Sequence, residues 1–177
     1  MSTLHVYSVS ENSWTELQNA PGSPRGGTSL VSIGSVLLRF GGFSGQELGG
    51  SVDVFHPSTN TWSSRKFTHG PGDRSVLTLL AHPVFPATKA VVLFGEKSPS
   101  SDGHNAAGTF WSDIWIYDYE VDQWEQAELE NVHVLTDGGI GWSAGASDGK
   151  HFFIWGGLNE NNERIGFGWQ VRFSNGS

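Results

Sequence analysis

The sequence predicts an all-β protein built from a repeated, four-stranded antiparallel sheet. Its apolar runs are short and are bounded by Gly, Pro, Asn and Ser, as strands are. No segment keeps the 3.6-residue apolar period of an amphipathic helix. Three sequence landmarks recur in a fixed order along the chain, which indicates a repeat architecture.

The first landmark is an aromatic, strand-like run that leads through a polar turn to a tryptophan. The run occurs at residues 4–8, 52–56 and 114–118, and the tryptophans that follow are Trp14, Trp62 and Trp124. Each run and its tryptophan segment predict two strands joined by a tight turn.

The second landmark is an apolar run that ends in glycine, and the third is a short segment that precedes it. The glycine positions are Gly41-Gly42, Gly95-Glu96 and Gly156-Gly157, so that Glu96 takes the place of a second glycine. The preceding segments are Pro24-Arg25-Gly26, Asp73-Arg74-Ser75 and the degenerate Ile140-Gly141-Trp142. We expect the glycines to end strands where the backbone needs unusual dihedral angles.

This order of arginine, glycine-ended run, aromatic run and tryptophan resembles the kelch repeat, whose period is about 50 residues. The resemblance covers nearly the whole chain. It implies β-propeller blades, which are four-stranded antiparallel sheets that bury their faces against neighbouring blades.

The landmarks divide residues 1–177, read as a single partial kelch propeller, into about three blades. We expect two strands of a half blade in 3–18, four in 26–66, four in 75–128, and three in 141–173, where the last strand is lacking. Closed propellers have at least about four blades, so the fold is expected to be incomplete as a single closed propeller. The open blade faces are expected to be apolar and to find a partner.

Two explanations of the incomplete propeller remain open. The chain is a piece of a longer propeller, or two copies self-associate through the open blade faces to supply six blades. Symmetric self-association is the commonest route to an oligomer.

Composition and charge exclude several functions. The net charge of −8 argues against nucleic acid as a partner, because phosphate binding needs a basic surface. The chain has no cysteine, which excludes disulfides and zinc–thiolate sites. No stretch is long and apolar enough to cross a membrane, and no secretory signal is visible, so we expect a cytoplasmic protein.

The loop at residues 96–104 is the strongest candidate for chemistry. Glu96, Asp102 and His104 offer carboxylate and imidazole groups that suit a divalent metal such as iron. The segment resembles the corresponding blade of fungal kelch proteins and of plant nitrile-specifier and thiocyanate-forming kelch proteins, where a Glu-x-x-x-Asp-x-x-x-His motif is held to bind ferrous iron. Glu96 and His104 match that motif, but Ser100 stands at the middle position. A solvated loop without metal, and hence no cofactor, is the alternative.

Four further residues are candidate ligand contacts. Arg25 and Arg74 are expected near the mouth of the central channel, where arginines bind anionic or polar small molecules, or else are buried and bond loop carbonyls. Trp111, next to the 96–104 loop, is predicted to be an exposed ring, and Trp142 is a second aromatic candidate.

Three functions follow from these patterns. The first is an interaction module that binds a protein partner through its propeller loops, without enzymatic activity. The second is a small-metabolite-binding or metal-dependent propeller enzyme of specialised metabolism that resembles the specifier proteins. The third is an inactive propeller fragment.

Overall fold

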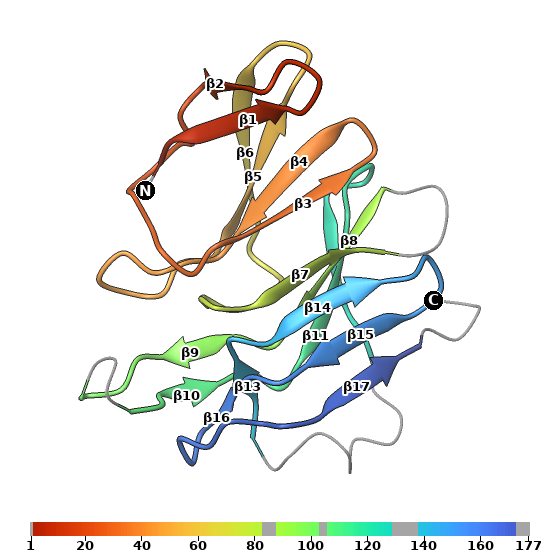
Figure 1. Ribbon diagram of the computed structural model, residues 1–177. Coiled ribbons are helices and arrows are strands. Elements are labelled where there is room, and N and C mark those ends of the chain that lie inside the picture. The colour runs from red at the N-terminus through yellow and green to blue at the C-terminus, as the bar shows by residue number, and fades with distance from the viewer. Residues whose placement is uncertain (1, 83–87, 103–105, 129–137, 173–177) are drawn as a thin grey trace.

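The computed structural model describes residues 2–82, 88–102, 106–128 and 138–172, and it confirms the all-β prediction. All the regular elements within these ranges are β-strands, and all the strand pairs are antiparallel (Figure 1). None of the described segments forms an apolar helix long enough to cross a membrane.

Four blade sheets follow one another along the chain. The first is a hairpin of β1 (Leu4–Ser8) and β2 (Ser13–Leu17). The second contains β3 (Ser29–Ile33), β4 (Val36–Phe40), β5 (Ser51–His56) and β6 (Thr61–Lys66). The third contains β7 (Thr78–Ala81), β8 (Lys89–Leu93), β11 (Ile114–Asp118) and β12 (Gln123–Gln126). The fourth contains β14 (Ala144–Ser147), β15 (Phe152–Trp155) and β17 (Gly168–Val171).

Two small sheets extend from the ends of the third and fourth blade sheets. One pairs β9 (Glu96–Ser98) with β10 (Thr109–Phe110), and the other pairs β13 (Ile140–Gly141) with β16 (Leu158–Asn159). Both small sheets lie at one end of the stack (Figure 1).

The aromatic runs and their tryptophans form matching hairpins. Tyr7 pairs with Trp14, Phe55 with Trp62 and Tyr117 with Trp124 across the strands, with ring centroids 4.9, 5.1 and 4.9 Å apart. The turns contain Asn12, Asn60 and Asp122 with φ of 49°, 52° and 56°, a left-handed conformation that short polar side chains adopt more readily than others. The first landmark therefore encodes one hairpin, repeated three times.

Apolar residues alternate between the two faces of the third blade sheet, so both faces are buried. Ala90 and Val92 pack against the second sheet, and Val91 and Leu93 pack against the fourth. Because burial of each such side chain contributes about 1.5–3 kcal/mol, these two apolar layers hold the stack together.

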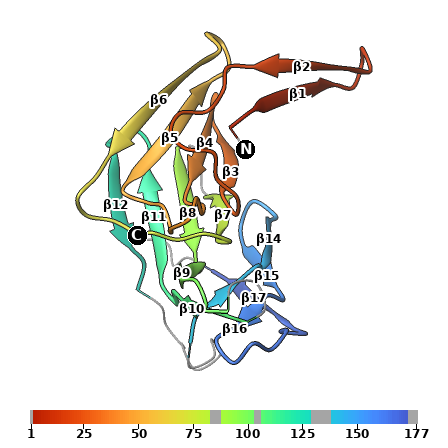
Figure 2. The same ribbon diagram turned by 90° about the vertical axis from the view of Figure 1, so that its left-hand side faces the viewer.

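The innermost strands β3, β7 and β14 lie beside one another (Figure 2). Ser29 donates its hydroxyl to the carbonyl of Leu77 at 2.8 Å, and Thr78 donates to the carbonyl of Ser143 at 3.3 Å. The same bond thus links each inner strand to the next. The sheets form an open stack around these strands and do not close into a ring.

Candidate functional site: the axial pocket

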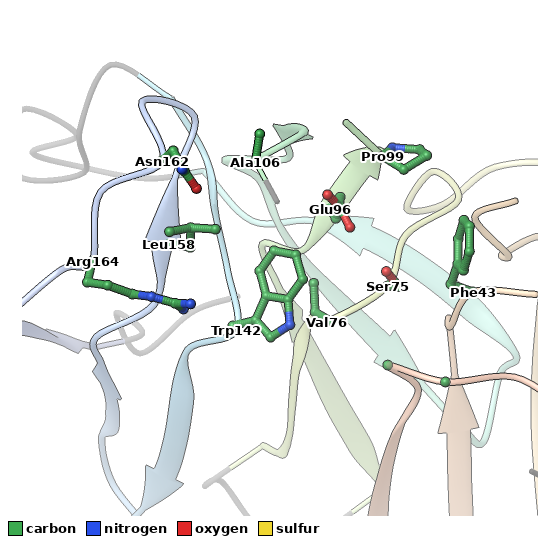
Figure 3. A pocket seen from close by; sticks show the side chains of 12 residues that line it. Phe43, Ser75, Val76, Glu96, Pro99, Ala106, Trp142, Leu158, Asn162 and Arg164 are labelled. Atoms are coloured by element: carbon green, nitrogen blue, oxygen red, sulfur yellow. The ribbon is translucent and has the colours of Figure 1, made fainter. Parts of the chain in front are cut away.

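A pocket of about 520 Å³ opens where the inner strands of three blade sheets begin, and we call it the axial pocket (Figure 3). Its volume lies within the range of small-ligand and side-chain binding sites. The lining residues come from the second, third and fourth sheets: Gly26, Gly27, Phe43, Ser75, Val76, Glu96, Pro99, Ala106, Trp142, Leu158, Asn162 and Arg164.

Equivalent positions of the three sheets line this pocket. Backbone pairs join Gly26 to Phe43, Ser75 to Glu96 and Gly141 to Leu158, each just outside the blade sheet proper. Phe43, Glu96 and Leu158 therefore occupy the same place in three successive repeats. Phe43 and Leu158 are apolar, and only Glu96 has an acidic side chain.

The residues that follow the arginine landmark also converge on the pocket. Val76 donates its backbone N–H to the carbonyl of Gly27, and Trp142 donates its own to the carbonyl of Val76. All three have left-handed φ, at 59° for Gly27, 47° for Val76 and 56° for Trp142. A β-branched residue and a tryptophan adopt this conformation at a cost of about 1–3 kcal/mol each, and such strain concentrates at functional sites.

The structure corrects the alignment of Glu96 with a second glycine. Phe94 and Gly95 have φ of 59° and 108°, which match the 71° and 113° of Gly41 and Gly42 and the 66° and 114° of Gly156 and Gly157. Phe94 thus occupies the first glycine position and Gly95 the second. The alignment by apolar runs is shifted by one residue because β8 ends at Leu93, and Phe94 is a buried aromatic in left-handed conformation.

The carboxylate of Glu96 lies on the pocket wall and is almost fully buried, with 8% of the residue exposed. Glu47, which follows Phe43 in the second sheet's loop, is also buried, with 7% exposed. The Ser75 side chain lies close enough to the Glu47 carboxylate to act on it as a hydrogen-bonding group.

Burial raises the pKa of Glu47 to about 7. The nearby Ser75 side chain acts in the opposite direction, and the carboxylates of Glu96 and Asp73 raise the pKa further. The carboxylates of Glu96 and Asp73 therefore both act on Glu47 at this end of the stack. Sequence reasoning missed Glu47, because only the fold brings its loop against the third blade sheet.

Arg74 has a structural environment rather than a ligand-facing one. Its side chain is fully buried and makes two bonds to the Asp113 carboxylate, at 2.6 and 3.1 Å. It also donates to the carbonyls of Gly72 and Phe94, at 3.1 and 2.9 Å. Of the two roles considered for this arginine, the structure favours the buried one that bonds loop carbonyls.

Arg25 has a similar environment at the equivalent position of the second sheet. Its guanidinium lies 3.6 Å from Asp53 and donates to the carbonyl of Gly41, while Arg39 makes the closer contact with Asp53 at 2.7 Å. Burial and the neighbouring Arg39 lower the pKa of Arg25, although Asp53 counteracts them. Arg25 thus directly precedes Gly26, which lines the pocket, but directs its own charge toward Asp53 of the second sheet.

Trp111 and Trp142 have different surroundings. Trp111 is half-buried and lies beneath two cations, with Arg74 at 4.9 Å and Lys97 at 4.6 Å from its ring centroid, and its indole N–H donates to the carbonyl of Asp73. The expected exposed ring is instead Trp142, which is 43% exposed, lines the pocket and contacts Phe110 edge to face.

The three proposed metal ligands are not placed together by the described residues. Glu96 is buried, Asp102 is exposed, and His104 lies outside the described residues. Among the residues that the structure describes, no group of three or more His, Asp or Glu is arranged to hold a metal ion. The iron site involving His104 therefore stays a prediction.

Comparison with known proteins agrees with the repeat seen in the structure. A search of curated proteins found no match. The profile of the kelch motif matches residues 24–65, which run from the arginine landmark into β6 and include all three landmarks in order. The second blade sheet therefore carries a kelch motif. The third blade sheet has the same four-stranded antiparallel architecture.

Proposed function

We propose that the chain is a non-enzymatic interaction module that binds a protein partner through the loops around the axial pocket. Kelch repeats are general interaction modules, and residues 24–65 carry this motif. The observation that supports this site is the exposed Trp142, which projects into a pocket lined by loops of three sheets. Exposed tryptophans in concave, partly apolar surroundings are the typical anchors of protein interfaces.

Loop residues from distant parts of the chain supply the other contacts. Phe43, Pro99 and Leu158 are apolar, while Asn162 and Arg164 are exposed polar residues at the rim. An apolar centre with a polar rim is the usual anatomy of a protein-binding surface.

Replacement of Trp142 by glycine tests this proposal. The equivalent residue of the second sheet is Gly27, so W142G removes the ring and also relieves the left-handed backbone strain. We expect the affinity for a partner captured from native extract, then purified and measured by calorimetry, to fall at least tenfold.

The matched control is Trp14→Ala, which removes a more exposed tryptophan, at 70%, from the hairpin. We expect W14A to bind as the unaltered chain does. Equal affinity of W142G and the unaltered chain would refute a partner site at the axial pocket.

A further inference from the structure

The outer face of the fourth blade sheet carries two aromatic rings at positions that are buried in the second sheet. Trp155 directly precedes Gly156 as Phe40 precedes Gly41, yet Trp155 is 63% exposed and Phe40 only 1%. Phe153 lies two residues before Trp155 on the same face and is 44% exposed. In the second sheet this face packs on the next sheet along the chain. The fourth sheet therefore exposes the face that a following sheet covers.

The hairpin of β1 and β2 exposes the opposite kind of face. Tyr7 and Trp14 are 40% and 70% exposed. Their equivalents in the third sheet, Tyr117 and Trp124, are 1% and 7% exposed because they pack against the preceding sheet. The hairpin thus exposes the face with which a sheet packs on the sheet before it.

The junction between the second and third sheets shows how two such faces fit together. The Phe40 ring contacts the Trp124 ring, with centroids 5.4 Å apart. Both rings belong to the apolar cluster that holds these two sheets together. When the same junction forms between the two exposed faces, Trp155 takes the place of Phe40 and Trp14 the place of Trp124. Contacts between large rings dominate the energetics of such interfaces.

The charges of the two faces are also opposite. Residues 2–20, which contain the hairpin, include Glu11 and Glu16 but no Lys or Arg. Arg172 lies on the outer face of the fourth sheet, since it donates to the Gln170 side chain at 3.1 Å and Gln170 pairs with Phe153. Opposite charges favour contact between the hairpin and the fourth sheet, whereas contact between two copies of the same face brings like charges together.

We propose that the chain assembles head to tail, with the hairpin of one copy packed on the outer face of the fourth sheet of a second copy. The two faces lie at opposite ends of the stack, so one chain does not join them (Figures 1 and 2). A second copy fits because the same chain carries both halves of the contact, with matching ring positions and opposite charges. This surface is separate from the axial pocket, and the inference does not depend on the proposed function.

Two double variants, each altered on one face, test this arrangement. Tyr7→Ser/Trp14→Ser changes the hairpin face, and Phe153→Ser/Trp155→Ser changes the face of the fourth sheet. We expect self-association of each variant alone to weaken at least tenfold in sedimentation velocity, because the contact needs one face of each kind. An equimolar mixture retains one intact hairpin and one intact sheet face, and it should form a pair with twice the 19.2 kDa mass of one chain.

Crosslinking locates the contact while all four rings remain in place. The chain has no cysteine, so Glu16→Cys on the hairpin and Gln170→Cys on the fourth sheet each introduce a single thiol. Facing sheets lie about 10 Å apart, a distance that a short bismaleimide reagent spans. We expect covalent pairs in the mixture of the two variants, and at least tenfold fewer with either variant alone. In the matched control, Val121→Cys, an exposed residue of the β11–β12 turn, replaces Gln170→Cys and should not crosslink to Glu16→Cys.

The outcomes distinguish between possible occupants of these faces. A monomeric unaltered chain at every concentration, or a mixture of the double variants that stays monomeric, would overturn the proposal and leave the faces to other sheets or proteins. Undiminished self-association of either double variant alone would also overturn it, because contact between like faces would then suffice. The ¹⁵N amide spectrum reports whether each variant is folded, and the crosslinking result decides alone where a double variant is not. W142G should self-associate as the unaltered chain does, so loss of partner binding in that variant leaves this proposal intact.

Discussion

Glu47 is the residue whose titration should dominate the pH dependence of stability near neutrality. Its pKa is raised from an ordinary 4.5 to about 7, chiefly by burial. Between these two values the folded chain retains a proton that the unfolded chain has released. The folded state therefore binds more protons there, and its stability decreases as the pH rises through this window.

We expect the free energy of unfolding, measured by urea denaturation, to fall by up to about 3 kcal/mol between pH 4.5 and pH 7 because of this one group. Glu47→Gln should remove this part of the slope. Glu125→Gln, which replaces an exposed acid, should retain it. An unchanged slope in E47Q would show that Glu47 titrates normally.

The two arginines of the repeated landmark, Arg25 and Arg74, have different acidic partners. Both Arg25 and Arg74 precede an inner strand, yet Arg74 binds Asp113 within the third sheet's loops and Arg25 shares Asp53 with Arg39. The landmark predicts an arginine at the strand entrance but not its acidic partner, because the partner comes from a segment far along the chain.

Glycines at the ends of the apolar strands set how closely neighbouring sheets approach. A side chain on Gly41 would place Cβ 2.4 Å from Leu77 and 2.5 Å from the carbonyl oxygen of Arg74, and its φ is 71°. Gly45, in the following loop, also has a left-handed φ, of 94°, but, its two chain neighbours aside, no described atom lies within 4 Å of the position that its Cβ would take. The two residues thus differ in packing and resemble one another in backbone conformation.

We expect Gly41→Ala to reduce the free energy of unfolding by at least about 3 kcal/mol, since it adds a steric clash between sheets to the backbone strain. Gly45→Ala should cost only the strain, about 1–2 kcal/mol. Urea denaturation of both variants measures the difference. Equal losses would mean that the second and third sheets can separate at this point without cost.

The outermost faces of the stack expose large apolar side chains. Phe153 and Trp155 of the fourth sheet are 44% and 63% exposed, and Trp14 of the hairpin is 70% exposed. In the interior of the stack, comparable faces are covered by the next sheet, as the two apolar clusters show. Exposed aromatic faces of this kind favour association.

We predict that the chain self-associates reversibly through these faces. Light scattering on a sizing column, over a dilution series, should give a mass above 19.2 kDa that falls on dilution. The double variant Phe153→Ser/Trp155→Ser should shift the chain toward the monomer, while Val121→Ser, an exposed residue of the β11–β12 turn, should not. A monomer at every concentration would contradict the prediction. The axial pocket would then be the remaining candidate for a binding surface.

The strands of the blade sheets, the hairpins and their repetition were predictable from the sequence, whereas the two small sheets, β9–β10 and β13–β16, were not. The blade strands and hairpins depend on local interactions: the pairing of Tyr or Phe with Trp across a turn, the polar residue that adopts a left-handed turn, and apolar alternation along a strand. Such features involve residues close in the chain, so their spacing is visible in the sequence.

Which residues form the site depends on how the sheets pack together. Phe43, Glu96 and Leu158 become equivalent only when their backbones pair with the preceding strand entrances, and one residue of misalignment at Phe94 concealed this. The approach of Glu47 to Ser75 and Glu96, and the exposure of Trp142 instead of Trp111, depend on the packing of successive sheets. These contacts join segments separated by tens of residues, and their burial and charge follow from the distance between sheets, which no local pattern specifies.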